Sequence, residues 1–193
     1  MARSKAFDQV AVLEKAMEVF WQQGYEATSI QDLVTAMGIN RGSLYDTFTD
    51  KRQLFLKAIA HYNQTVVNTV IERLKAPGAA RQAIEDHFHG IVEQVANDTQ
   101  CRGCLITNTI VELGRQDGAI ALQTKANLQQ IEDAFFCALL QAQDQGEIGP
   151  DKDARALARY FTTTLQGLRV TSKLNPDPTV LQDVVTLILS VLD

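Results

Sequence analysis

The chain has 193 residues, a net charge of −5 and 46% hydrophobic residues, which is enough apolar side chain for a packed core. No apolar run reaches the roughly 18 residues that a membrane-spanning helix requires, and we expect neither a membrane anchor nor a signal peptide. Three cysteines, an odd number, argue against a secreted disulfide framework, so a cytoplasmic protein without a cofactor is expected.

The first predicted helix spans about 7–23 and leads into Gly24. Its apolar residues recur at helical spacing, with Val10, Met17 and Phe20 on the expected core face. Gly24 is a natural terminator, because glycine accepts the left-handed backbone that often closes a helix. No strand-like alternation is sustained anywhere in the chain, so an all-α fold is predicted.

Two short helices are predicted next, over 30–37 and 41–48. The first repeats apolar residues at the i, i+3, i+4, i+7 spacing of one buried face. Gly38 then stands where a tight turn needs a positive φ angle, and Asn40 is a good N-cap for the second helix. Two helices joined by a short turn containing glycine form the helix-turn-helix motif, whose second helix enters the DNA major groove.

This region resembles the TetR/AcrR family of bacterial transcriptional regulators. Three runs are similar: Gly24-Tyr25-x-x-Thr28-Ser29-Ile30, then Gly38-Ile39-x-Arg41-Gly42-Ser43-Leu44-Tyr45-x-x-Phe48, then Lys51-x-x-Leu54-Phe55. Matches at this many fixed positions favour the family over an ordinary helical hairpin with a solvated polar face. Beyond about residue 60, only the length and the all-helical pattern agree with it.

The resemblance implies a set of DNA-contacting residues: Thr28, Ser29, Arg41, Gly42, Ser43, Tyr45, Thr47 and Lys51. Arginine suits a guanine edge or a phosphate, and a helix N-terminus attracts phosphate through its free amides. The charge balance of this region argues against a uniformly basic DNA-binding surface, because residues 1–55 hold six Lys or Arg against seven Asp or Glu. DNA binding therefore requires basic residues to gather on one surface: Arg3, Lys5, Arg41, Lys51 and Arg52.

The remaining chain is predicted to be a helical bundle, with helices over about 51–75, 79–97, 105–113, 119–145, 154–174 and 179–192. We divide the chain into a DNA-binding domain, 1–50, and an effector-binding and dimerisation domain, 51–193, connected by the helix 51–75. The last helix has an apolar stripe too wide for one contact. We expect the last two helices to form a four-helix dimer interface that includes Leu165 and Ile188, although burial within one subunit is the alternative.

Polar residues within apolar helices, together with aromatic neighbours, indicate an effector pocket. We expect it to be lined by Phe88, Cys104, Asn108, Glu112, Phe135, Gln166 and Arg169, although the polar members also fit a solvent-facing role. Cys101-Arg102-Gly103-Cys104 is a single C-x-x-C motif. It fits an incidental pair, a thiol switch activated by the adjacent arginine, or, least well, a metal site, which usually needs two such pairs. We expect no metal.

The sequence thus indicates a homodimeric repressor that a small-molecule or thiol-reactive effector releases from a pseudo-palindromic double-stranded DNA operator. Two other classes stay open. A small helical enzyme with a cysteine nucleophile would need a histidine near Cys101 or Cys104, and a protein-interaction module would use the apolar C-terminal face. Neither accounts for residues 24–55.

Overall fold

A computed structural model describes residues 7–98 and 100–193, and within them every regular element is helical, which confirms the all-α prediction. In chain order the helices are α1 (Gln9–Gln23), α2 (Ile30–Met37), α3 (Arg41–Phe48), α4 (Lys51–Tyr62), α5 (Asn68–Leu74), α6 (Ala80–Asn97), α7 (Leu105–Leu113), α8 (Gly118–Asp144), α9 (Ala154–Thr171) and α10 (Pro178–Leu189). Among the residues described, none of these helices has the length and apolar character needed to cross a membrane.

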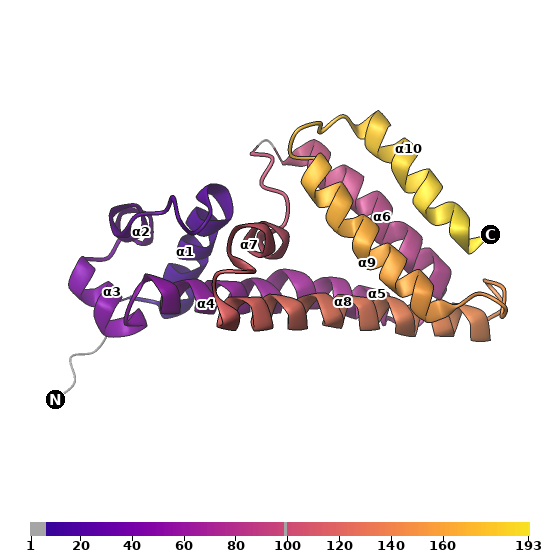
Figure 1. The fold of residues 1–193 in the computed structure, drawn as a ribbon, viewed down its shortest axis with the longest axis horizontal. Helices are drawn as coiled ribbons and strands as arrows, with labels where there is room; N and C mark the ends of the chain where they lie inside the picture. Colours follow the sequence, from indigo (N-terminus) through magenta and orange to yellow (C-terminus); the bar gives the residue numbers. More distant parts are fainter. Residues whose placement is uncertain (1–6, 99) are drawn as a thin grey trace.

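Helices α1 to α3, here called the N-terminal unit, lie at one end of the molecule (Figure 1). They pack with α4 around fully buried side chains that include Phe20, Leu33, Leu44 and Phe55. The predicted core residue Val10 is 60% exposed instead, because Val12 and Ala16 occupy the inward face of α1.

Side-chain caps fix where the short helices begin. Ser29, Asn40 and Asp50 each accept a hydrogen bond from the backbone N–H three residues further on, which satisfies a donor that has no partner inside the helix. Gly24 and Gly38 have positive φ angles of 83° and 70°, as the predicted helix ends require. Sequence therefore locates both ends of the helix-turn-helix.

The turn between α3 and α4 was not predicted. Thr49 has φ 70° and ψ −56°, and the Asp50 N–H donates across it to the Phe48 carbonyl at 2.8 Å. This is a γ-turn of the strained kind, with positive φ at a β-branched residue. This turn sets the angle between the end of α3 and the start of α4.

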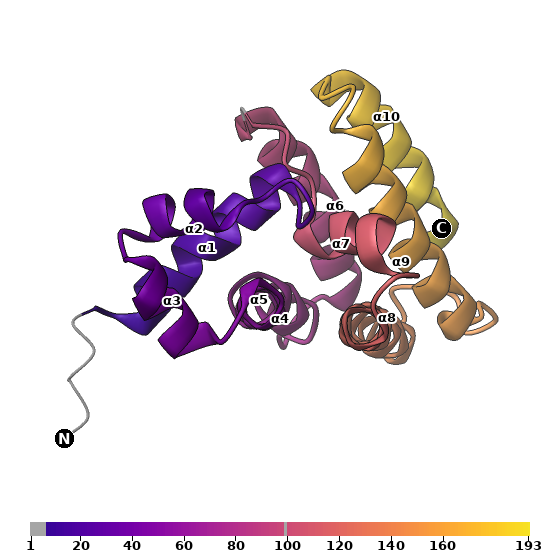
Figure 2. The same cartoon turned by 60° about the vertical axis from the view of Figure 1, so that its left-hand side comes forward.

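The predicted helix over 51–75 is continuous in direction but not regular. A π-helical segment, Asn63–Val67, separates α4 from α5. Such segments insert one extra residue into a turn and are frequent at functional sites. Figure 2 shows α4 and α5 nearly end-on beside α8, the longest helix.

At the other end, α6, α8, α9 and α10 form the C-terminal bundle. Its centre is a cluster of buried aromatic rings, with Phe88, Phe135 and Phe161 at centroid distances of 5.4–5.9 Å from one another. Helix α7 lies between this bundle and the N-terminal unit (Figures 1 and 2). Leu122 in α8 is an exposed apolar residue, with 70% of its surface accessible.

Candidate DNA interface and effector cavity

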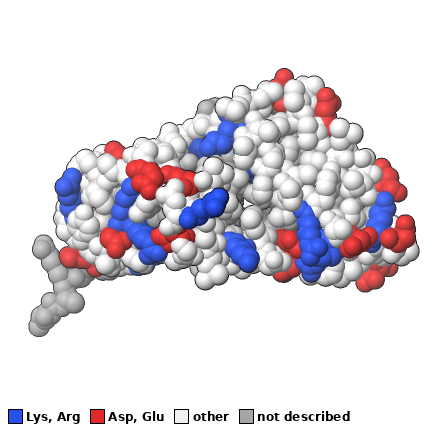
Figure 3. All heavy atoms as spheres, viewed as in Figure 1, with Lys and Arg blue, Asp and Glu red and all other residues white. Residues whose placement is uncertain are grey.

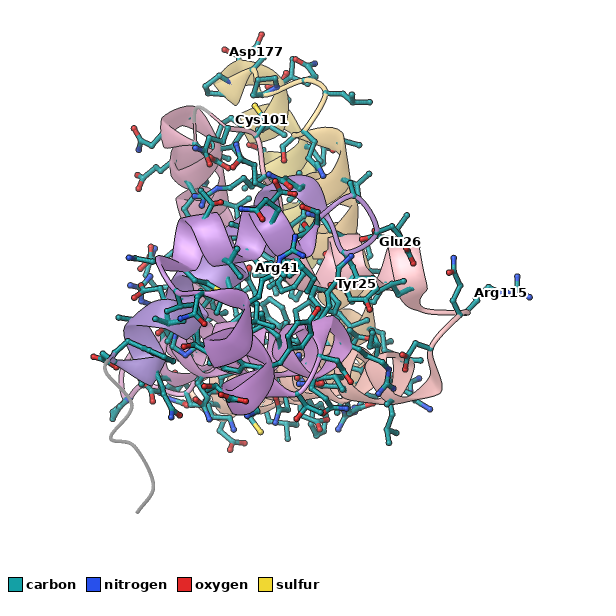
Figure 4. All side chains as sticks on the ribbon, turned by 90° about the vertical axis from the view of Figure 1, so that its left-hand side faces the viewer. Tyr25, Glu26, Arg41, Cys101, Arg115 and Asp177 are labelled. Atoms are coloured by element: carbon teal, nitrogen blue, oxygen red, sulfur yellow. The ribbon has the colours of Figure 1, made fainter. Side chains whose placement is uncertain are left out.

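Helix α3 presents a polar face to solvent at the end of the molecule (Figure 4). Arg41, Gly42 and Tyr45 are exposed, whereas Ser43 and Thr47 are half-buried at the sides of the helix. Leu44 and Phe48 point inward and hold α3 on the N-terminal unit. The arginine is close to α2, where its Nη2 donates to the Gln31 side chain at 3.3 Å. The structure therefore places five of the predicted DNA-contacting residues on one helix, with donors available to phosphate oxygens and base edges.

The predicted phosphate site at the start of α2 is not supported by its side chains. Thr28 is buried, and its hydroxyl donates to the Gly24 carbonyl at 2.6 Å. Ser29 is exposed but committed to a capping box with Asp32, whose carboxylate accepts from both the backbone N–H and the hydroxyl of Ser29. These hydrogen bonds lower the pKa of Asp32, so a negative charge stays at this helix end. The assignment of Thr28 to DNA is wrong for its side chain, because that side chain closes the turn instead.

Lys51 lies at the start of α4, against the loop between α1 and α2. Its Nζ is 4.4 Å from the centroid of the Tyr25 ring and donates to the Glu26 carbonyl at 3.5 Å. These weak contacts leave the ammonium free to exchange its partner for a phosphate.

The predicted basic surface is only partly formed. Arg52 turns away to an ion pair with Asp117 at the N-cap of α8, with Nη2 to Oδ1 at 2.8 Å. Its guanidinium holds the pKa of Asp117 far below its usual range, so the pair is fully charged. Arg3 and Lys5 lie outside the described residues. In Figure 3 acidic and basic side chains alternate over the N-terminal unit.

A cavity of about 790 Å³ lies behind the N-terminal unit. Its walls come from α1, from the α4–α5 region, from α6, from Asp98 and residues 100–103, and from α9 with the residue that follows it. They comprise Glu18, Trp21, Tyr62, Val66, Arg73, Gly90, Glu93, Gln94, Val95, Asn97, Asp98, Gln100, Cys101, Arg102, Gly103, Arg169 and Ser172. Pockets for small molecules commonly have this size.

Helix α1 contributes to this cavity through a set of interactions that we call the Arg102 contact. Arg102 donates to the Glu18 carboxylate at 2.5 Å and stacks on the Trp21 ring, with the guanidinium carbon 4.3 Å from the centroid. The Trp21 indole N–H donates to the Gly103 carbonyl at 3.2 Å. The N-terminal unit is thus attached to the cavity wall by a charged pair, a cation–π contact and a hydrogen bond.

Comparison with known proteins agrees with this architecture. Residues 12–58 match the family described as bacterial regulatory proteins, tetR family, and residues 80–188 match the tetracyclin repressor-like C-terminal domain. The chain belongs to the TetR family of transcriptional regulators. The resemblance found in residues 24–55 is therefore confirmed, and it extends through the C-terminal bundle.

Relatives within the TetR family cover nearly the whole chain. The HTH-type transcriptional regulator YezE of Bacillus subtilis is 43% identical over 100% of both chains. The HTH-type transcriptional repressor ComR of Escherichia coli is 33% identical over 89% of this chain and 82% of its own length. A cysteine-substituted form of the TetR family regulator CifR, solved with a 26-base-pair operator, is 31% identical with a TM-score of 0.83, covering 97% of this chain and 98% of that one.

The predicted effector-pocket residues are distributed over three environments. Only Arg169 lines the cavity. Phe88 and Phe135 are fully buried in the aromatic core, so the prediction that they line a pocket is wrong. Glu112 is wrong as well, because its carboxylate faces the N-terminal unit and accepts the backbone N–H groups of Tyr25 at 2.9 Å and Glu26 at 2.7 Å. We call this the Glu112 contact.

Three further predicted pocket residues make contacts inside the protein. Gln166 accepts from the Thr107 hydroxyl at 2.5 Å, and Asn108 donates to the Arg102 carbonyl at 2.9 Å. The Cys104 sulfur accepts from the Tyr62 hydroxyl at 3.7 Å. None of these three belongs to the cavity lining, but two of them hold residues that do.

The C-x-x-C motif lies at the junction of the cavity and α7. Cys101 lines the cavity with a positive φ angle of 49°, and Cys104 occupies the N-cap position of α7. Both are free thiols and half-buried. Within 7–98 and 100–193, no three His, Cys, Asp or Glu side chains gather in a way that could hold a metal ion.

Glu18 and Trp21 were not predicted to line a cavity. Both were assigned to a helix of the DNA-binding domain, and nothing in their spacing distinguishes a side chain facing a cavity from one facing water. The chain's single tryptophan, at the end of an amphipathic helix, is the one hint available in the sequence.

Proposed function

We propose that the chain is a homodimeric transcriptional repressor that binds a pseudo-palindromic operator and is released by a small-molecule or thiol-reactive effector. The exposed polar face of α3, on a helix-turn-helix with intact caps, is the observation that supports it most directly. It is also supported by ComR, which is a repressor, and by CifR, whose structure holds operator DNA. The proposal includes no catalytic step and places the protein in the cytoplasm, where its DNA would be.

In this proposal α3 lies in the major groove. Arg41 and Tyr45 contact base edges or phosphates, with Ser43 and Thr47 at the sides and Gly42 allowing a close backbone approach. Lys51 leaves the Tyr25 ring to neutralise one phosphate. The backbone N–H groups around Ser29 provide further phosphate contacts.

The proposed dimer joins α9 and α10 to the same helices of a second copy. Tyr160 of α9 is 37% exposed, and Val180, Val184 and Leu187, which share one face of α10 by their spacing, are 44%, 41% and 71% exposed. The surface over these two helices is largely uncharged in Figure 3. A stable dimer would cover such a patch.

The residues first expected at that interface need correction. Leu165 and Ile188 are only 5% and 4% exposed within one protomer, because they pack in the C-terminal bundle. A charge at either position would unfold the subunit rather than separate two subunits. The division of the chain into 1–50 and 51–193 stays a prediction.

The effector acts, in this proposal, at the cavity that Cys101 and Arg169 line. A ligand there, or modification of Cys101 or Cys104, would disturb the Arg102 contact and change the position of the N-terminal unit. Two recognition helices bind one operator only at the correct separation, so this movement lowers affinity.

Selection of duplexes from a random library by the purified protein tests the proposal. We expect enrichment of one sequence as two inverted half-sites, bound with strong salt dependence. Tyr45→Ala should abolish the enrichment while the protein stays folded. Recovery of no preferred duplex, or the same preference by Tyr45→Ala, would refute the assignment.

A further inference from the structure

The charges that line the cavity sum to zero but are unevenly distributed, because two carboxylates gather on one arginine. Three arginines and three carboxylates line it. Arg102 is paired with Glu18 and also lies 3.5 Å from Asp98, so two carboxylates surround this one guanidinium. Arg73 and Glu93 are exposed, so water solvates their charges. Arg169 is the half-buried arginine of the lining without a carboxylate partner among the described residues.

Arg169 has a polar partner but no carboxylate among the described residues. Its Nη2 donates to the Gln94 side-chain oxygen at 3.1 Å, which is a neutral acceptor. The residue is half-buried, and its guanidinium reaches the open side of the cavity, where it can meet a ligand. A ligand carrying a negative charge would supply the missing counter-ion.

A buried imidazole on α6, His87, lies behind the cavity lining. Burial, together with the positive charges of Arg169 and Arg73, lowers the pKa of His87 to about 4, so this imidazole is neutral at pH 7. Its buried Nε2 has no hydrogen-bond partner in the part of the chain that the structure describes. His87 precedes Gly90 by one turn on α6, and Gly90 and Gln94 continue the same row along the cavity.

The remaining walls suit a flat ligand body. Trp21 and Tyr62 meet edge to face with centroids 5.0 Å apart, and Val66 and Val95 add apolar surface. An aromatic wall beside a guanidinium that has no carboxylate partner suits a ring or conjugated chain that ends in a carboxylate.

We propose that this cavity binds a compact aromatic or conjugated carboxylate, with Arg169 as the counter-ion, and that the ligand's charge competes with Glu18 for Arg102. The proposal rests on the effector-released repressor proposed above. When the ligand anion draws Arg102 away, the Glu18 ion pair opens and α1 loses its charged attachment to the cavity wall. A ligand that binds more tightly to the state with the open ion pair increases the population of that state. The state in which α1 is attached, which binds the operator, becomes less populated.

Trp21 makes the test direct, since it is the only tryptophan in the chain and lines the cavity. Three probes of nearly equal shape are titrated into the full-length protein while Trp21 fluorescence is recorded: benzoate, benzamide and benzamidine, which are negative, neutral and positive. We expect a saturable response to benzoate with at least tenfold tighter binding than to the other two. Tenfold corresponds to one charge-assisted hydrogen bond of about 1.4 kcal/mol.

Variants assign that preference to Arg169. Arg169→Gln should reduce it to less than about threefold, whereas Arg169→Lys keeps the charge and should retain it. Arg115→Gln is the matched control, because Arg115 projects away from the rest of the protein at the end of α7 (Figure 4). The proposal is overturned by an absent benzoate response, by benzamide or benzamidine binding as tightly, or by an unchanged preference in Arg169→Gln. If Arg169→Gln does not fold, the proposal is still tested by the order of affinity of the three probes for the wild type and for Arg169→Lys.

Two further variants test whether the ligand competes with Glu18 for Arg102. Glu18→Gln and Glu93→Gln each remove one carboxylate from the lining, but only the first releases Arg102. We expect Glu18→Gln to tighten benzoate binding several-fold more than Glu93→Gln does. Equal effects would show a general charge effect and would refute the competition. None of these measurements uses DNA, so their failure is distinguishable from failure of the duplex selection.

Discussion

Removing the Glu112 carboxylate should loosen the N-terminal unit from α7. Its two oxygens accept backbone N–H groups at 2.9 Å and 2.7 Å, across more than eighty residues of sequence. Hydrogen bonds to a charged group contribute about 1.5–3 kcal/mol each, and partial exposure here reduces this to about 1 kcal/mol each. We therefore expect Glu112→Ala to lower the free energy of unfolding by about 2 kcal/mol.

Glu112→Gln separates the hydrogen bonds from simple packing. Its single oxygen can accept one N–H, and its amide group faces the other donor, so at least half of the stabilisation, about 1 kcal/mol, should be lost. Gly24 is part of the same contact, because a Cβ there would lie 3.0 Å from the Glu112 carboxylate oxygen. Gly24→Ala should be destabilising in the wild type, and less so beside Glu112→Ala once the steric conflict is gone. The positive φ at Gly24 accounts for what remains.

The assay is urea unfolding at a fixed protein concentration, because dimerisation would add to the apparent stability. Glu14→Ala serves as the control, since Glu14 is exposed on α1. If Glu112→Ala and Glu14→Ala unfold at the same urea concentration, the Glu112 contact contributes nothing and the reasoning fails.

Four other changes have expected outcomes. Thr49→Gly should raise the free energy of unfolding by about 1 kcal/mol, because glycine adopts the positive φ of the γ-turn without strain; unchanged or lower stability in urea would contradict the strain. Leu187→Glu should give a folded monomer in sedimentation, and an intact dimer would exclude α10 from the interface. Lys51→Ala should reduce the salt slope of operator binding by about one, with an unchanged slope removing its phosphate contact. The pKa of His87 is lowered to about 4, so the unfolded chain binds a proton here more readily, and the free energy of unfolding falls as pH drops from about 6.5 to 4. His87→Gln should remove about 3 kcal/mol of this acid sensitivity, and identical pH profiles of unfolding would refute it.

Local signals in the sequence specified the helices well. Caps such as Asn40 and turn glycines such as Gly38 act within a few residues, so their effect can be predicted without knowing the tertiary structure. The γ-turn at Thr49 was not predictable, because threonine disfavours positive φ and only packing of α3 against α4 imposes it. The π-helical segment Asn63–Val67 likewise has no sequence pattern of its own.

The candidate site also has one part that was predictable from the sequence and one part that was not. The exposed face of α3 followed from helical spacing, since one face of a short helix must be buried and the other must not. The cavity depended on contacts between residues far apart in sequence, and a polar residue in an apolar helix has several outcomes. Glu112 binds backbone amides, Gln166 binds a neighbouring threonine, and Arg169 alone faces the cavity. Periodicity places all three on helices but does not tell which element each one will meet.

Besides the packing of α4 and α5, three polar contacts between the two ends of the molecule converge on α7 and the residues beside it. Arg102 precedes α7 and holds α1; Glu112 lies in the last turn of α7 and holds the loop before α2; Asp117 follows α7 and holds Arg52 at the start of α4. These three attachments span little more than four helical turns of chain, so a small rotation of α7 moves all of them together. Cys104 stands at the N-cap of α7, and the cavity borders the segment before it. An event at either place can therefore act on the whole N-terminal unit through one short helix, without any change in the packing of the C-terminal bundle.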